Sequence, residues 1–141
     1  MILDNSLILA DGASSTVSEA STDYIDTLAA GNDYKGAFVV VKVEGTAFTA
    51  GAGSPTATFQ LQTHSATDFN GGVTLNSSAA LLAASLTANT IVWKAQIPPH
   101  AKRYLRVYKV VNNNADTTKF SAGNWSAFVV KDVDVLISGA Q

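Results

Sequence analysis

The chain contains no cysteine and few charged residues. The lack of cysteine excludes disulfides, zinc–cysteine sites and thiol nucleophiles. Charged residues make up only 14% of the 141 residues, against about 25% in ordinary globular domains. We therefore expect a surface of Ser, Thr, Asn, Ala and Gly, side chains that lose little rotamer entropy when a partner covers them. This composition favours a permanent assembly, although an unspecialised β domain fits it equally well.

A strong charge of one sign and long apolar runs are lacking too. Nine basic and eleven acidic residues give a net charge of −2, which offers no electrostatic support for binding nucleic acid or an anionic membrane. The longest apolar runs, 79–86 and 37–41, are far shorter than the roughly 18 residues of a membrane span. We therefore expect neither nucleic acid nor a membrane as a partner.

What the sequence does contain is β-strand patterning. Runs of β-branched residues and alternation of apolar with polar residues predict strands along most of the chain. In the alternating run 56–63, Phe59 and Leu61 should face the core. The other predicted strands are 37–44, 90–97, 103–111, 128–130 and 133–137, separated by turn signals at 31–33, 51–55, 70–72, 112–114 and 123–124.

About eight strands at this spacing predict an all-β fold, with a jelly-roll-like antiparallel β-sandwich favoured over other sandwiches and barrels. The length of the chain and the lack of a linker-like stretch predict one domain over residues 1–141. One segment, Ser77 to Leu86, is rich in Ala and Leu and contains no glycine. We expect a loop there that could include one helical turn.

Residues suited to catalysis or metal binding are scattered. His64 and His100 each lack a second ligand at metal-binding spacing, so a loop or strand-end position is the favoured interpretation. Asp132 and Asp134 would share one face of a strand and could chelate calcium, but calcium needs six or more oxygen ligands. A solvated sheet face explains these two aspartates better.

Two other segments have ordinary structural explanations. Asp23 and Asp26 suit turns or caps better than general acid–base work. The segment 51–53 matches no phosphate-binding loop, because neither a lysine nor a helix-opening glycine follows at the required spacing. The sequence thus predicts a protein that is not an enzyme and that holds no metal or cofactor.

The segment Lys102 to Lys109 combines basic and aromatic residues. Strand alternation places Tyr104, Arg106 and Tyr108 on one face and the intervening Leu105 and Val107 on the other. Tyr and Arg are enriched in protein–protein interfaces, so this face is a candidate docking surface. Two alternatives stay open: a nucleic-acid contact, and an arginine simply packed along two tyrosines in a polar sheet face.

Several segments taken in order resemble a known family, the cement proteins of tailed bacteriophage capsids, typified by the Bordetella phage cement protein. The resemblance lies in the order and spacing of the segments, since each alone is ordinary strand sequence, and it covers most of residues 15–135. The segments are 20–26, 38–43 leading into 46–49, 57–63, and 103–108 after a proline-containing turn.

This resemblance implies a jelly-roll subunit on the outer surface of the virion capsid. Such a subunit would bridge neighbouring major capsid proteins and self-associate, with a homodimer expected. We hypothesise that residues 1–18, polar and turn-rich apart from Leu7, Ile8 and Leu9, form an arm that binds a neighbouring subunit or the capsid surface.

Two other functions remain open at this stage. A carbohydrate-binding jelly roll of a phage fibre would use exposed aromatic side chains, for which Trp93, Trp125, Tyr104 and Tyr108 are candidates. A minor structural protein of the tail or neck is the other alternative.

Overall fold

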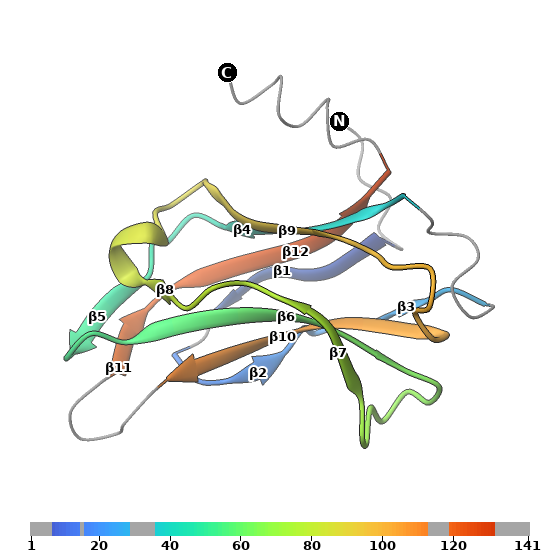
Figure 1. Cartoon of the computed structure of the whole chain (residues 1–141). Coiled ribbons are helices and arrows are strands. Elements are labelled where there is room, and N and C mark those ends of the chain that lie inside the picture. The colour runs from blue at the N-terminus through green and yellow to red at the C-terminus, as the bar shows by residue number, and fades with distance from the viewer. Residues whose placement is uncertain (1–6, 15, 29–35, 113–118, 132–141) are drawn as a thin grey trace.

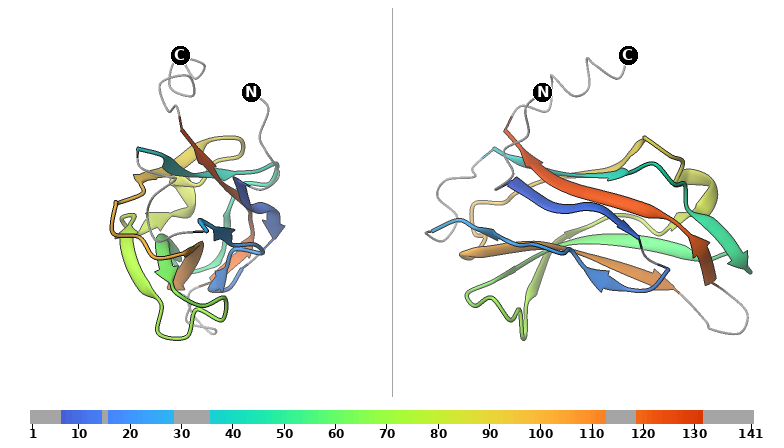
Figure 2. Two further views of the ribbon diagram at one scale, coloured as in Figure 1. Left: turned by 90° about the vertical axis from the view of Figure 1, so that its right-hand side faces the viewer. Right: turned by 180° about the vertical axis from the view of Figure 1, so that it is seen from behind.

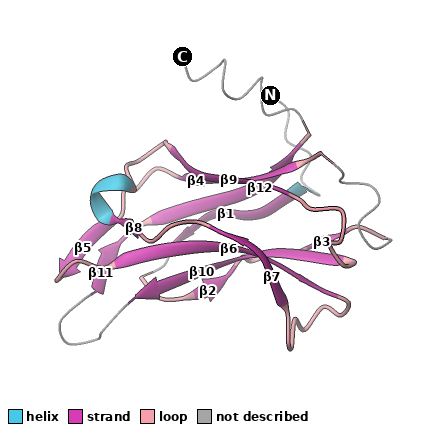
Figure 3. Cartoon of the chain, viewed as in Figure 1, coloured by secondary structure: helices cyan, strands magenta, loops and turns pink. Residues whose placement is uncertain are grey.

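Two antiparallel β-sheets face each other and hold most of the strands (Figures 1 and 3). The computed structural model describes residues 7–14, 16–28, 36–112 and 119–131. The strands in chain order are β1 (Ile8–Ser14), β2 (Glu19–Ala20), β3 (Ile25–Asp26), β4 (Phe38–Val43), β5 (Thr49–Ala52), β6 (Thr56–His64), β7 (Val73–Ser77), β8 (Leu81–Leu82), β9 (Ile91–Gln96), β10 (Tyr104–Asn112), β11 (Lys119–Ala122) and β12 (Asn124–Val130).

One sheet, called here the β4 sheet, has the order β1-β12-β4-β9. The other, the β10 sheet, has the order β2-β10-β6-β7, and β3 and β8 add to β10 and β6. Strands β2 and β3 pair with successive parts of β10, so they act as one interrupted edge strand. Strands β7 and β8 likewise pair with successive parts of β6. With each interrupted edge strand counted once, the two sheets form the eight-stranded, double Greek-key arrangement of a jelly roll. The predicted fold class is confirmed, and Figure 2 shows the two layers from the end and from behind.

The inner faces of the two sheets form the core. Strands β6 and β10 alternate strictly between buried and partly exposed residues, and Phe59, Leu61, Leu105 and Val107 are fully buried. Phe59 meets Trp125 of the opposite sheet with 5.6 Å between ring centroids. Burying side chains of this size contributes about 1.5–3 kcal/mol each, so the alternation fixes the register of both strands.

The first strand corrects the prediction of an N-terminal arm. Residues Ile8–Ser14 form β1, which pairs with β12 inside the β4 sheet. Leu9 is fully buried, and its carbonyl accepts a hydrogen bond from the Asp23 backbone N–H at 2.8 Å. The stretch 8–14 is therefore part of the sandwich, because its apolar residues are needed in the core. Residues 1–6 lie outside the described residues.

Strands β5 and β11 form a separate two-stranded sheet at one end of the sandwich (Figure 1). The prediction of a turn over 51–55 was wrong in part, because Gly51 and Ala52 belong to β5. After β11, Gly123 has a φ of +154°, and a Cβ there would lie 2.5 Å from the Phe48 ring. This site therefore requires glycine.

The remaining predictions fall on loops and on the end of the chain. The segment Ser77 to Leu86 contains β8 and a single 3₁₀ turn at Ala83–Ser85, in agreement with the predicted loop and helical turn. The predicted strand 133–137 lies outside the described residues. No helix in the described part of the chain has the length and apolar character of a membrane span.

Candidate functional site

The outward side of the β10 sheet carries the three residues predicted to share a face. Tyr104, Arg106 and Tyr108 are partly exposed, whereas Leu105 and Val107 between them are fully buried. The predicted alternation is confirmed. Together with Tyr24 and Phe69, these three residues form a surface called here the Arg–aromatic face.

Arg106 lies at the centre of the Arg–aromatic face. Its guanidinium carbon lies 4.4 Å from the centroid of the Phe69 ring and 5.5 Å from that of Tyr108. Its Nε donates a hydrogen bond of 2.9 Å to Gln62 Oε1, and Gln62 Nε2 donates in turn to Gln60 Oε1. Partial burial lowers the pKa of Arg106, but a guanidinium remains charged in proteins. The face therefore presents a positioned cation.

Phe69 reaches this surface from the loop between β6 and β7. Its φ of +50° is uncommon for a residue with a side chain, and only 5% of its surface is exposed. The Gly72 N–H donates to the Phe69 carbonyl at 3.0 Å, which closes a turn of the loop. The sequence pattern indicates a turn at 70–72 but not the role of Phe69, because only the folded-back loop brings this ring against Arg106.

Tyr24 and Tyr104 extend the face toward one end of the sheet. Their rings meet edge to face at 5.5 Å, and Tyr24 also lies 6.3 Å from Phe69. Tyr24 is 47% exposed, so it offers a large amphipathic side chain to a partner.

A second arginine borders the face and is fully paired. Arg103 Nε donates a hydrogen bond of 2.8 Å to Asp26 Oδ1, and Arg103 Nη2 donates one of 2.8 Å to Asp26 Oδ2. The hydrogen bond from Arg103 lowers the pKa of Asp26. Asp26 Oδ1 also accepts from the Leu28 N–H at 2.8 Å, in keeping with the turn-forming role predicted for this aspartate.

Neither histidine lies in a cluster of metal ligands in the described part of the chain. No group of three or more His, Cys, Asp or Glu residues in the described ranges could hold a metal ion. His64 closes its own loop, where its Nδ1 accepts a hydrogen bond from the Ala66 N–H at 3.0 Å. His100 lies in the turn that follows β9. Asp132 and Asp134 lie outside the described residues.

Lys109 was missed as an interior residue. It is fully buried between the sheets, with its Nζ 3.4 Å from Glu19 Oε1, 5.4 Å from the Phe48 ring and 5.7 Å from the Trp125 ring. Trp125 Nε1 donates to the same Glu19 oxygen at 3.2 Å. Burial lowers the pKa of Lys109 to about 8. Alternation places position 109 inward, but the carboxylate that accompanies it lies 90 residues earlier in the chain.

The aromatic residues proposed for sugar binding are dispersed. Trp125 is fully buried in the core, which contradicts its candidacy, and Trp93 is partly buried and packed against the same core. Tyr104 and Tyr108 stay on the Arg–aromatic face.

The N-terminal candidates lie on the other sheet. Leu9 is fully buried and Leu7 is partly buried against the core, while Ile8 is partly exposed opposite Phe128 of β12. The structure thus does not bring Leu7, Ile8 and Leu9 together with the Arg–aromatic face, and full burial removes Leu9 as a contact residue.

The outward side of the β4 sheet is apolar. Phe38 and Val40 of β4 lie beside Phe128 and Val130 of β12, and all but Phe38 are at most 7% exposed. This second apolar cluster is separate from the core between the sheets.

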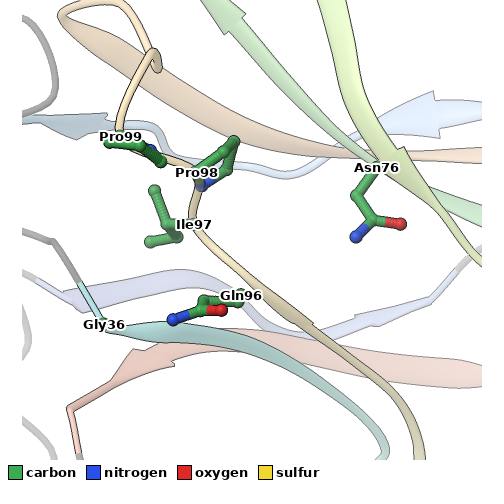
Figure 4. A pocket seen from close by; sticks show the side chains of 6 residues that line it. All are labelled: Gly36, Asn76, Gln96, Ile97, Pro98 and Pro99. Atoms are coloured by element: carbon green, nitrogen blue, oxygen red, sulfur yellow. The ribbon is translucent and has the colours of Figure 1, made fainter.

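A depression of about 460 Å³ lies near one edge of the sandwich, where β7 and the end of β9 face each other (Figure 4). None of its lining side chains is an acid, a base or a nucleophile, so these residues supply no group for acid–base or nucleophilic chemistry. The lining residues are Gly36, Asn76, Gln96, Ile97, Pro98 and Pro99.

A comparison with protein-family models identifies the family of this chain. The sequence profile of the Bbp16 family matches residues 9–129, which include all of the Arg–aromatic face and nearly the whole sandwich. No curated protein matches the chain. The family name suggests a Bordetella phage protein, which is consistent with the phage origin that the sequence resemblance implies. The chain belongs to the Bbp16 family.

Proposed function

We propose that this protein is a structural virion component that coats the outer surface of a tailed-phage capsid and bridges major capsid protein subunits. The observation that carries the proposal is the Bbp16 match over residues 9–129, which agrees with the ordered resemblance to capsid cement proteins. The jelly-roll sandwich is compatible with such a role.

Such a protein would stabilise the shell through the thermodynamic linkage between binding and assembly. A protein that binds the assembled shell but not its separated subunits stabilises the shell by mass action. Contacts to two neighbouring subunits act together through effective concentration, so modest contacts are enough. We further propose that the protein self-associates as a homodimer, which would double the attachment points, and that it performs no catalysis.

Two surfaces are candidates for attachment. The Arg–aromatic face offers Tyr and Arg side chains, which are enriched in protein interfaces. The N-terminal residues 1–6 are the second candidate, since β1 itself belongs to the sandwich. Deleting residues 1–6 should reduce occupancy on shells without changing the melting temperature. Full occupancy of the deletion variant would exclude the arm.

The main experiment is rebinding to shells from which the protein has been removed. The purified protein should bind these shells to saturation, at symmetry-related positions, and raise their resistance to heat. Occupancy confined to the tail or neck would instead support the minor structural protein. Glycan binding that quenches tyrosine fluorescence, without shell binding, would support the carbohydrate-binding alternative.

A further inference from the structure

Two arginines lie three residues apart in the chain, Arg103 just before β10 and Arg106 within it, and they differ in what they bind. Arg103 uses Nε and Nη2 in a bidentate pair with Asp26. Arg106 donates only from Nε, and its acceptor is the neutral amide of Gln62. Within the described residues, no carboxylate forms an ion pair with Arg106, and neither Nη group has a hydrogen-bond acceptor.

The Arg106 side chain is already held in place. The Phe69 ring packs against the guanidinium at 4.4 Å, Tyr108 lies on it at 5.5 Å, and Gln62 fixes Nε. Arginine has a large rotamer entropy, and a positioned guanidinium loses less of it for each hydrogen bond formed on binding. Aromatic packing also removes part of its hydration, which strengthens a charge-assisted hydrogen bond.

The chemistry of the free Nη groups selects the ligand. Two parallel N–H donors of a guanidinium match the two oxygens of a carboxylate. The nearby carboxylate of Asp26 is already neutralised by Arg103 and does not compete for Arg106. Tyr108 contacts the Arg106 guanidinium, and Tyr24 connects Phe69 with Tyr104, so the face offers the aromatic surface typical of an interface centre.

We propose that Arg106 is the receptor for an aspartate or glutamate side chain of the protein that this chain binds. The inference rests on the proposed function, because it takes the major capsid protein as the partner. It adds the chemistry of the contact: one carboxylate of the partner binds the Arg106 guanidinium beside the Tyr108 ring. A nucleic-acid phosphate is the competing ligand, and the net charge of −2 disfavours it.

The test compares the binding of the wild type and three variants to shells stripped of this chain. Arg106→Gln removes the cation and should weaken binding by about 10- to 100-fold, the range for a lost charge-assisted contact. Arg106→Lys keeps the charge but loses the planar fork, so its affinity should fall between the two. Lys94→Gln is the matched control, since it removes one positive charge from β9 of the opposite sheet and should bind as the wild type does.

A pH series identifies the ligand. The advantage of the wild type over Arg106→Gln should begin to shrink as the pH falls below about 4, where a free carboxylate is protonated, and should vanish below the lower pKa of the paired carboxylate. An advantage that persists at lower pH, or oligonucleotide binding that Arg106→Gln abolishes, would overturn the carboxylate assignment. Circular dichroism and melting temperature verify that each variant is folded.

The outcomes separate this inference from the proposed function. Equal shell affinity of the wild type and Arg106→Gln, with the wild type binding well, overturns the inference alone. A wild type that does not bind shells overturns the proposed function and the inference with it. Weakened binding by Arg106→Gln and normal binding by Lys94→Gln support both.

Discussion

The outward sides of the two sheets differ in chemistry. On the β4 sheet, Phe38, Val40, Phe128 and Val130 form an apolar cluster that is largely buried. On the β10 sheet, the corresponding side carries the Arg–aromatic face.

The strands of the two sheets differ accordingly in sequence pattern. Strand β4 is apolar along nearly its whole length, whereas β6 and β10 alternate at every residue. Continuous apolar runs belong to strands buried on both faces, and alternation belongs to strands with one accessible face. The docking surface is therefore expected on the alternating sheet.

The largest effect should come from removing an outward aromatic residue of the β4 sheet. Phe128→Ala should lower the free energy of unfolding by about 3–5 kcal/mol, as an interior phenylalanine would, because Phe128 is only 7% exposed. Tyr108→Ala on the other sheet should cost about 1 kcal/mol, since Tyr108 keeps part of its surface in water. Urea unfolding measures both. Similar small losses would mean that the outward side of the β4 sheet is not tightly packed.

The second prediction concerns the inward side of β10, behind the Arg–aromatic face. Burial lowers the pKa of Lys109 to about 8, while in the unfolded chain it stays near 10.5. Between these pH values the unfolded state binds more protons, so this lysine makes stability rise with pH. The cost of burying the charged Lys109 lowers stability fully below about pH 8, and it disappears as the pH approaches 10.5. Each pKa unit corresponds to about 1.4 kcal/mol, so the gain reaches up to about 3 kcal/mol.

The variant Lys109→Met isolates this effect from other titrations. It keeps an unbranched side chain in the same space and leaves Glu19 paired with the Trp125 N–H. Relative to this variant, the wild type should become more stable as the pH rises from 8 to 10.5 in urea unfolding. A stability difference that does not change with pH would show that the pKa of Lys109 is not lowered in the folded protein.

The same two sheets show what the sequence could and could not predict. Alternation in 103–111 and 56–63 was sufficient to place Tyr104, Arg106 and Tyr108 outward and Phe59 and Leu61 inward, because one face of each strand is apolar. The continuous run 37–44 correctly predicted β4, but it did not show which face would contact the core.

The missed features depend on contacts distant in sequence. β2 and β3 have two residues each and exist only because β10 offers an edge, so no local pattern marks them. Phe69 reaches Arg106 through a left-handed turn that local propensity disfavours. Lys109 is rare among interior residues, since a buried lysine needs a partner that sequence patterns do not reveal.

The smallest expected effect tests the border of the Arg–aromatic face. The folded-state pKa of Asp26 is lowered, so the pair with Arg103 stabilises the protein above the unfolded pKa near 3.8 and is lost as the pH falls through the folded value. Asp26→Asn should therefore lower the melting temperature only slightly at pH 7, because Arg103 is exposed and Asp26 partly exposed, so water screens the pair. At a pH below both pKa values, the two proteins should melt together. Shell binding should fall much less in Asp26→Asn than in Arg106→Gln, since Asp26 borders the face whereas Arg106 lies at its centre. If Asp26→Asn and Arg106→Gln lost binding equally, the recognised surface would be centred on Arg103 and Asp26. The contrast between a paired and an unpaired arginine would then not mark the docking site.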